Sequence, residues 1–201
     1  MSKKRELENY VRKKIERLLK IGNTPFGKAE LANLRRGLGK KPGDLPELWG
    51  SFLLDMPEAF IGKGDEPSRE EWSCYLALTL FAMHQQSRDL EKSPMHVEGV
   101  TLGRAMKMLS TSEDDENSDK RVLKRLNALS SSKDIKELAH HLRMIISLLK
   151  SNKIPLDYAL LAGDIYYLQI EPYAATVRLK WGRDFYRKEK DNNKRGEKNE
   201  R

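Results

Sequence analysis

The chain has 201 residues, of which 38% are hydrophobic, so it is long enough to bury a core and too apolar for a wholly disordered protein. Its 38 Lys and Arg residues outnumber its 30 Asp and Glu residues, and the net charge of +8 predicts an anionic partner, either a nucleic acid or a membrane surface. A single cysteine (Cys74), no apolar run near the ~18 residues of a membrane span, and no apolar stretch of a signal peptide lead us to expect a soluble, cytoplasmic protein that is not embedded in a membrane.

Charge divides the chain into three consecutive blocks. Residues 1–41 carry 13 Lys or Arg against four Asp or Glu, and residues 120–201 carry 19 against ten. Residues 42–119, between them, carry six against 16. Two basic blocks therefore flank an acidic one, and an anionic ligand should meet only part of the surface.

Helical periodicity runs through the chain, and no stretch of useful length alternates like a strand. Ser2 is the expected N-cap of the first helix and Gly22 its stop, and Gly37 ends the second helix before a Gly- and Pro-rich loop. Taken in chain order, we expect helices over residues 3–21, 25–36, 46–53, 72–86, 101–109, 119–130, 133–151, 155–169 and 173–187.

One predicted helix and one polar segment suggest how the helices are organised. Residues 68–71 form a capping box before the helix over 72–86, which is apolar on nearly all sides and should lie at the centre of a bundle. The segment 111–118 is polar, acidic and without apolar residues, which is typical of a linker. We therefore predict an all-α protein with two small helical bundles, over residues 1–110 and 119–187, joined by an acidic linker over 111–118 and followed by a disordered basic tail over 188–201.

Three basic surfaces could bind an anion. The first is the run from Leu34 to Lys41, where cations at the end of a helix lead into a Gly-rich loop. The other two are stripes opposite the apolar faces of neighbouring helices, formed by Lys120, Arg121, Lys124 and Arg125, and by Lys136, His140, Arg143 and Lys150. A single stripe is usually a solvated face, and cations at a helix end also stabilise the helix dipole. The coincidence of three such segments favours a surface that binds phosphates.

Several motifs resemble catalytic or metal sites without meeting their requirements. Residues 22–29 nearly spell a phosphate-binding loop, but Ala29 replaces the hydroxyl that would hold magnesium, and a helix precedes the loop where the motif needs a strand. The adjacent pair His140 and His141 diverges on a helix, and His84 is expected to pack or to form a hydrogen bond. Asp157 and Asp164 lack the further carboxylates of a metal-dependent nuclease. We therefore predict no catalytic residues, no metal and no cofactor.

Seven segments, in this order, resemble the CasB family, the small subunit of the type I-E CRISPR surveillance complex called Cascade. They are Leu34-Arg35-Arg36-Gly37-Leu38-Gly39-Lys40, Leu80-Phe81-Ala82-Met83-His84-Gln85-Gln86, Thr101-Leu102-Gly103-Arg104-Ala105, residues 121–129, Leu138-Ala139-His140-His141-Leu142-Arg143, Ile154-Pro155-Leu156-Asp157-Tyr158, and Trp181-Gly182-Arg183-Asp184-Phe185-Tyr186. Each segment alone is weak, but the ordered set is specific, and the resemblance covers nearly the whole chain, from about residue 5 to 187.

The resemblance implies a non-catalytic subunit that assembles in more than one copy with other Cascade subunits. Its basic surface would support the hybrid of crRNA and target DNA and the displaced strand, and so stabilise the R-loop, in which backbone contacts can tip a nearly balanced exchange of duplexes. Carried over to this chain, that surface includes Arg35, Arg36, Lys40, Arg104, Arg121 and Arg143. Helical phase and proximity extend it to Arg125 and Lys41.

Two other classes of function compete with this interpretation. A basic helical scaffold or adaptor would dock on acidic proteins without touching nucleic acid. A metal-dependent nuclease would need Asp157 or Asp164 for cleavage, and the sequence gives that class almost no support. Salt dependence of oligonucleotide binding separates the first two classes, because contacts to phosphates release counterions.

Overall fold

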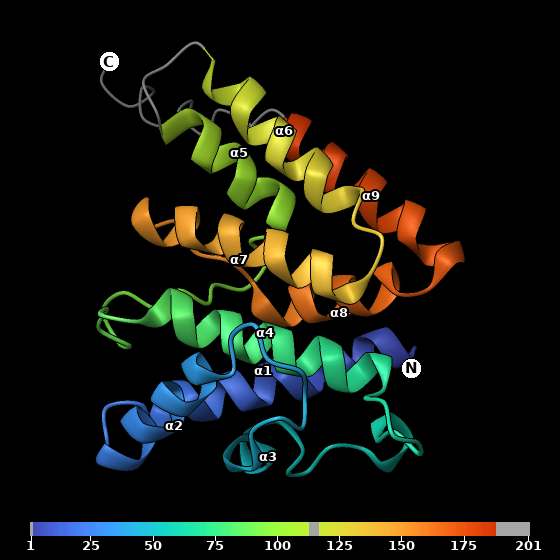
Figure 1. Ribbon diagram of the computed structural model, residues 1–201. Coiled ribbons are helices and arrows are strands. Elements are labelled where there is room, and N and C mark those ends of the chain that lie inside the picture. Colours follow the sequence, from blue (N-terminus) through green and yellow to red (C-terminus); the bar gives the residue numbers. More distant parts are fainter. Residues whose placement is uncertain (1, 113–116, 188–201) are drawn as a thin grey trace, which may run out of the picture.

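The computed structural model describes residues 2–112 and 117–187, and within these ranges the protein is all α-helical (Figure 1). This confirms the predicted fold class. The helices are α1 (Lys3–Ile21), α2 (Pro25–Arg36), α3 (Trp49–Phe52), α4 (Arg69–Gln85), α5 (Leu102–Ser112), α6 (Ser118–Ser130), α7 (Ile135–Ser151), α8 (Tyr158–Leu168) and α9 (Glu171–Tyr186).

The helix caps expected at the starts of α1 and α4 are both formed. Ser2 Oγ accepts a hydrogen bond from the Arg5 amide at the start of α1. At α4, Ser68 Oγ accepts from the Glu71 amide at 3.0 Å while the Glu71 carboxylate accepts from the Ser68 amide at 2.6 Å, which is a complete capping box.

The helix expected over residues 46–53 is broken instead. A 3-10 turn over Pro46–Leu48 leads into the single-turn helix α3, and the chain leaves helical geometry before Asp55, whose φ is +60°. So short a segment makes few internal hydrogen bonds, and Gly50 lowers its helix propensity further.

Helix α4 is the centre of the fold, as its apolar sequence predicted. Its side chains are buried on all sides, with Cys74, Leu78 and Phe81 each at 0% exposure. Figure 1 shows α1 and α2 on one side of α4, and α7 and α8 on the other; all four helices contact it. Elements from both ends of the chain therefore share one core around α4.

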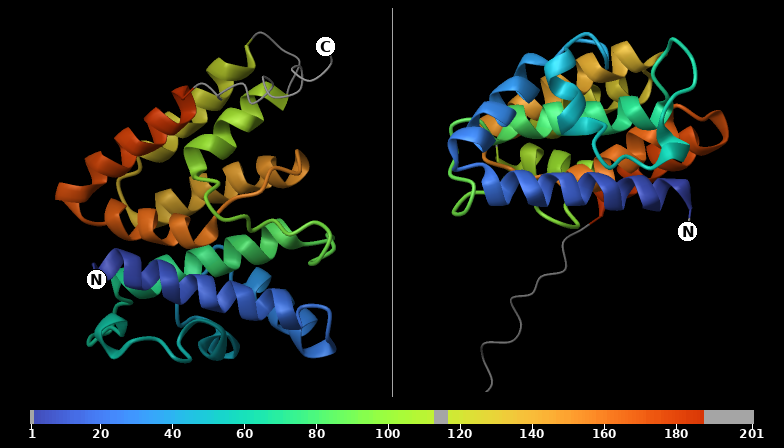
Figure 2. Two further views of the ribbon diagram at one scale, coloured as in Figure 1. Left: turned by 180° about the vertical axis from the view of Figure 1, so that it is seen from behind. Right: turned by 90° about the horizontal axis from the view of Figure 1, so that it is seen from below.

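Helix α1 packs lengthwise against α8, as both views of Figure 2 allow the reader to follow. At this contact a Cβ on Gly163 would lie 2.2 Å from Glu8 Oε1, so the Glu8 side chain would have to move aside. Helix α5 packs against α9 at Gly103, where a Cβ would lie 2.4 Å from the backbone carbonyl oxygen of Trp181, so this close approach requires a glycine. α5 also contacts α6 and α7, which groups it with the helices that follow it in the chain.

The predicted linker is only partly described. Its residues Thr111 and Ser112 complete α5, and Ser118 begins α6. Residues 113–116 of the linker and residues 188–201 of the predicted tail lie outside the described residues. Among the helices of the described ranges, none has the length and apolarity needed to cross a membrane.

Candidate nucleic-acid interface

A groove of about 300 Å³ brings together cations from two of the predicted basic segments. One wall is the loop after α2, which crosses in front of α4, and the other wall is the first half of α7 (Figure 1). The cationic or titratable side chains that line the groove are Lys40, Lys41, Lys136, His140 and Arg143. Residues far apart in the chain thus meet on one face.

The position of the loop after α2 is set by a hydrogen bond to its backbone and by the conformation of a glycine. The Gly37 carbonyl accepts a hydrogen bond from the Tyr75 hydroxyl of α4 at 2.8 Å. Gly39 has a φ of +79°, which an L side chain rarely adopts, and the chain there passes close to α7: a Cβ on Gly39 would lie 3.7 Å from an Arg143 guanidinium nitrogen. Tyr75 and Gly39 therefore set the position of Lys40 beside Arg143.

The floor of the groove is apolar. It consists of Trp72, Leu76 and Leu80 from one face of α4, with the hydroxyl-bearing Thr79 among them. On the α7 wall, Lys136 and Arg143 are seven residues apart, which places them on the same face about 10 Å from one another. A cationic rim over an apolar floor can contact both phosphates and the faces of unstacked bases.

The remaining predicted cations of the first basic segment point elsewhere or are paired. Arg36 forms an ion pair with Glu47 and does not line the groove. Lys41 lines it but is also paired with Glu66 at 2.7 Å. Arg35 lies in a neighbouring hollow, where burial lowers the pKa of its guanidinium.

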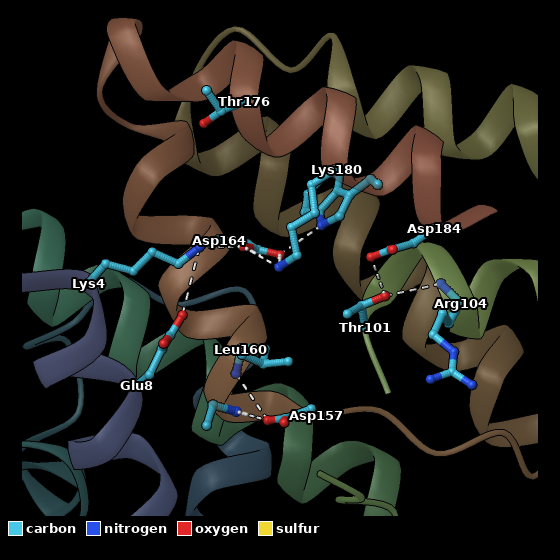
Figure 3. A network of polar contacts seen from close by, with 12 residues as sticks. Lys4, Glu8, Thr101, Arg104, Asp157, Leu160, Asp164, Thr176, Lys180 and Asp184 are labelled. Atoms are coloured by element: carbon cyan, nitrogen blue, oxygen red, sulfur yellow. Dashed lines mark hydrogen bonds and ion pairs between the residues drawn. The ribbon is translucent and has the colours of Figure 1, made fainter. Parts of the chain in front are cut away.

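The predicted cations of α5 and α6 also lie outside the lining of the groove. Arg104 is exposed in the first turn of α5, and its amide donates to Thr101 Oγ1, which in turn donates to Asp184 on α9 (Figure 3). Its guanidinium points away from this pair in Figure 3. Arg121 and Arg125 are exposed on α6, which contacts α5 and α7.

The two aspartates considered for a nuclease have structural partners. Asp157 is the N-cap of α8 and accepts hydrogen bonds from the Ala159 and Leu160 amides at 3.0 Å. Asp164 accepts from Lys4, Lys180 and the Trp181 indole (Figure 3). Within the described ranges, no group of three or more His, Cys, Asp or Glu side chains could hold a metal ion.

The side chains of Cys74 and His84 are part of the core. Cys74 is fully buried, and burial raises the pKa of its thiol to about 12, so it remains protonated at neutral pH. His84 is also fully buried, and its Nδ1 lies 2.8 Å from the Tyr158 hydroxyl. The position of His84 agrees with the packing or hydrogen-bonding role predicted for it from the sequence.

Sequence reasoning missed two cations near the interface, Lys28 and Arg88. Both line the hollow beside Arg35. Lys28 lies in the first turn of α2, within the segment that resembled a phosphate-binding loop, and Arg88 follows the end of α4 in a turn. Lys28 and Arg35 are seven residues apart in the helix predicted over 25–36, so helical phase already placed them on one face. Arg88 lies outside any periodic segment, and no local signal joined it to them.

Comparison with known proteins gives a consistent result. The sequence model of the family described as CRISPR-associated protein Cse2 matches residues 30–186. A crystal structure of CasB from Thermobifida fusca is 34% identical with a TM-score of 0.75, covering 90% of this chain and 98% of that one. A crystal structure of M. ruber CasB is 26% identical with a TM-score of 0.63, covering 88% and 92%. No curated protein matches the chain.

Proposed function

The chain belongs to the CasB (Cse2) family of CRISPR-associated proteins and is thus a subunit of a type I-E Cascade complex, and we propose that it binds nucleic-acid backbone there without catalysing a reaction. In this role it stabilises the hybrid of crRNA and target DNA and the displaced strand. It would do so together with the other Cascade subunits and with further copies of itself.

The groove between the loop after α2 and helix α7 carries this proposal. Its rim combines Lys40, Lys41, Lys136 and Arg143, and a polyanion bound there would release counterions from each neutralised phosphate. None of the described residues that line the groove is an Asp or Glu. Backbone contacts of this kind carry affinity and position but no sequence information, which suits a complex whose guide RNA reads the sequence.

The apolar floor favours a single strand or an opened duplex over an intact duplex. In a paired and stacked duplex the base faces are covered, whereas an unpaired strand exposes them to side chains such as Trp72 and Leu76. An R-loop contains such a strand. The candidates Arg104, Arg121 and Arg125 would contact phosphates outside the groove. Arg36, which is paired with Glu47, would contribute little.

The rival function is a scaffold whose basic faces dock on acidic surfaces of other subunits. Lys41 and Arg36 already pair with carboxylates of their own chain, and the same chemistry would let them pair with carboxylates of other subunits. Both functions need the same cations, so their removal from the complex alone would not separate them.

Binding of the full chain to labelled oligonucleotides across a salt series tests the proposal. We would compare the wild type with the variant K40Q/K41Q/R143Q and with the control K13Q/K20Q/K63Q, which removes three exposed cations outside the groove. Fluorescence anisotropy should give a negative log–log salt slope, and the groove variant should reduce its magnitude by about two for a single strand. The control should leave the slope close to that of the wild type.

Reconstituted Cascade provides the second arm. With the groove variant, permanganate reactivity of thymines in the displaced strand should fall, because the R-loop closes more often. No oligonucleotide binding by the wild-type chain, together with full R-loop formation by a complex that carries the groove variant, would refute nucleic-acid binding at this groove and favour the scaffold.

A further inference from the structure

We propose that a hollow beside the C-terminal end of α4 is a second binding site, which takes one phosphoryl group between Lys28, Arg35 and Arg88. The proposal rests on the proposed function where that phosphoryl group belongs to a nucleic acid. It adds residues that neither the sequence pattern nor the groove includes.

The hollow has a volume of about 220 Å³ and is built from three segments. The turn before α2 and its first turn provide Asn23 and Lys28, the last turn of α2 provides Arg35, and the chain after α4 provides Gln86 and Arg88. Cations and amides thus converge from separate directions. No Asp or Glu is among the described residues that line it.

Within the part of the chain that the structure describes, the Arg88 guanidinium makes one hydrogen bond, and one of its nitrogens has no partner. Ser87, with a φ of +64°, turns the chain at the end of α4, and an Arg88 guanidinium nitrogen donates to the Lys150 carbonyl oxygen of α7 at 2.6 Å. The Arg88 Nε is buried and has no hydrogen-bond partner among the described residues. A buried donor without an acceptor is unfavourable, so Arg88 gains a hydrogen bond if its guanidinium turns toward a phosphoryl oxygen in the hollow.

Several positive charges lie close together around the hollow. Burial lowers the pKa of the Lys150 ammonium, and repulsion from Arg35 and Arg88 lowers it further. Lys150 Nζ is held by the neutral Gln86 Oε1 at 2.9 Å. Cations that repel one another without a counterion between them are stabilised by a bound anion.

Two carboxylates next to the hollow do not line it. Glu91 Oε1 accepts a hydrogen bond from Asn23 Nδ2, at the edge of the hollow, at 3.4 Å. Asp89 accepts from the Glu91 and Lys92 amides of its own turn at 2.8 Å. A phosphoryl group fits this cluster better than a carboxylate does, since its tetrahedral oxygens can reach three donors and Arg35 can bind two of them.

The hollow is separate from the groove but continues it. Lys150 lies seven residues beyond Arg143 on α7, on the same face and about 10 Å further along the helix. On the opposite side, Arg35 at the end of α2 lies five residues before Lys40 in the sequence. One extended strand could therefore place one phosphate in the hollow and its neighbours over the groove.

Titration of the 15N-labelled full chain locates the site. The probes are inorganic phosphate, an unphosphorylated dT octamer and the same octamer with a 5′-phosphate, all at constant ionic strength. We expect saturable shifts of the Asn23 and Ser87 amide resonances, which R35Q and K28Q abolish. Lys63 precedes α4, at the far end from the hollow, so K63Q is the control of equal charge and should leave the shifts unchanged.

The three probes separate the sources of the phosphoryl group. Equal shifts with both octamers would assign a backbone diester, and shifts only with the phosphorylated octamer or inorganic phosphate would assign a terminal or free phosphate; each result supports the site. Salt-sensitive octamer binding that K40Q/K41Q/R143Q weakens, without any shift at Asn23 or Ser87, would overturn the hollow and leave the proposed function standing. Shifts with inorganic phosphate but no octamer binding would support the hollow and overturn the nucleic-acid function.

Discussion

The Trp181 indole of α9 donates a hydrogen bond to Asp164 Oδ2 of α8 at 2.9 Å, and both side chains are almost completely buried. The same carboxylate accepts from Lys180 at 2.9 Å and, from α1, from Lys4 at 2.9 Å. Asp164 therefore joins three helices, one of which comes from the opposite end of the chain (Figure 3).

Replacement of Asp164 by Ala should destabilise the protein strongly. The variant leaves the Trp181 indole without an acceptor, removes the carboxylate that pairs with Lys180, and leaves Lys4 with the longer ion pair to Glu8 at 3.7 Å. Removal of one member of a buried charge cluster costs about 3–5 kcal/mol. Urea unfolding followed by circular dichroism measures the loss. Since an amide can still accept from the indole, Asp164→Asn should lose less, and equal losses for both variants would contradict this account.

Two glycines of neighbouring elements should respond to Ala in opposite directions. At Gly103 the added methyl would meet the Trp181 backbone carbonyl at 2.4 Å, which cannot move without separating α5 from α9. We expect Gly103→Ala to cost about 1–3 kcal/mol. At Gly182, within α9, nothing lies within 4 Å of the new methyl, so Gly182→Ala should stabilise by about 0.5–1 kcal/mol. Thermal unfolding of both variants checks the pair, and a stable Gly103→Ala protein would contradict the described packing of α5 on α9.

Stability should fall as the pH is lowered because His84 is buried. Burial, reinforced by the Arg88 charge, lowers the pKa of His84 from 6.5 to about 4. Between these values the unfolded chain binds the proton and the folded protein does not, so the free energy of unfolding decreases as the pH falls below 6.5. His84 alone should account for about 2 kcal/mol between pH 7 and pH 5.

The contribution of His84 is separated from that of other groups by substitution. Burial also lowers the pKa of His96, which acts in the same direction. Urea unfolding of wild type and His84→Gln at pH 7 and pH 5 should show a smaller pH dependence in the variant. An unchanged pH dependence would mean that His84 does not carry the effect.

Arg143 and Arg36 carry the same charge but should contribute differently to nucleic-acid binding. Arg143 lines the groove, whereas the Arg36 guanidinium is paired with Glu47 outside it. Arg143→Ala should reduce the magnitude of the salt slope by about one, as expected for the loss of one phosphate contact. Arg36→Ala should change it little, and each variant serves as the charge-matched control of the other. A larger effect of Arg36→Ala would move the binding surface to the outer side of α2.

The elements of the fold could be predicted because their signals are local. The Ser68–Glu71 capping box marked the start of α4, and the apolar residues on all its sides marked its place in the core. Residues 46–53 contained only a weak helical pattern, and there the expectation of a single helix did not hold. Short segments are decided by what packs on them, which a local pattern does not contain.

The candidate site could be predicted only in part. Helical phase identified the stripe that includes Lys136 and Arg143, but not that it would face Lys40 across α4, since that depends on how two helices pack on a third. The ion pairs of these cations could not be predicted from the sequence either. Arg35 and Arg36 are adjacent in the sequence, yet Arg36 pairs with Glu47 and Arg35 lines the hollow. The contributions of the eight predicted cations to binding stay predictions.

The packing of α1 on α8 has a consequence for synthesis of the protein. Lys4 and Asp164 are partners across nearly the whole described chain, so α1 leaves the ribosome long before its principal partner exists. In that interval its apolar face, with Leu7, Val11 and Ile15, has no permanent cover. Contacts of such large sequence separation slow folding, and exposed apolar surface invites aggregation. Release of a nearly complete chain, rather than stepwise folding from the N-terminus, should therefore be the event that commits this protein to its native structure.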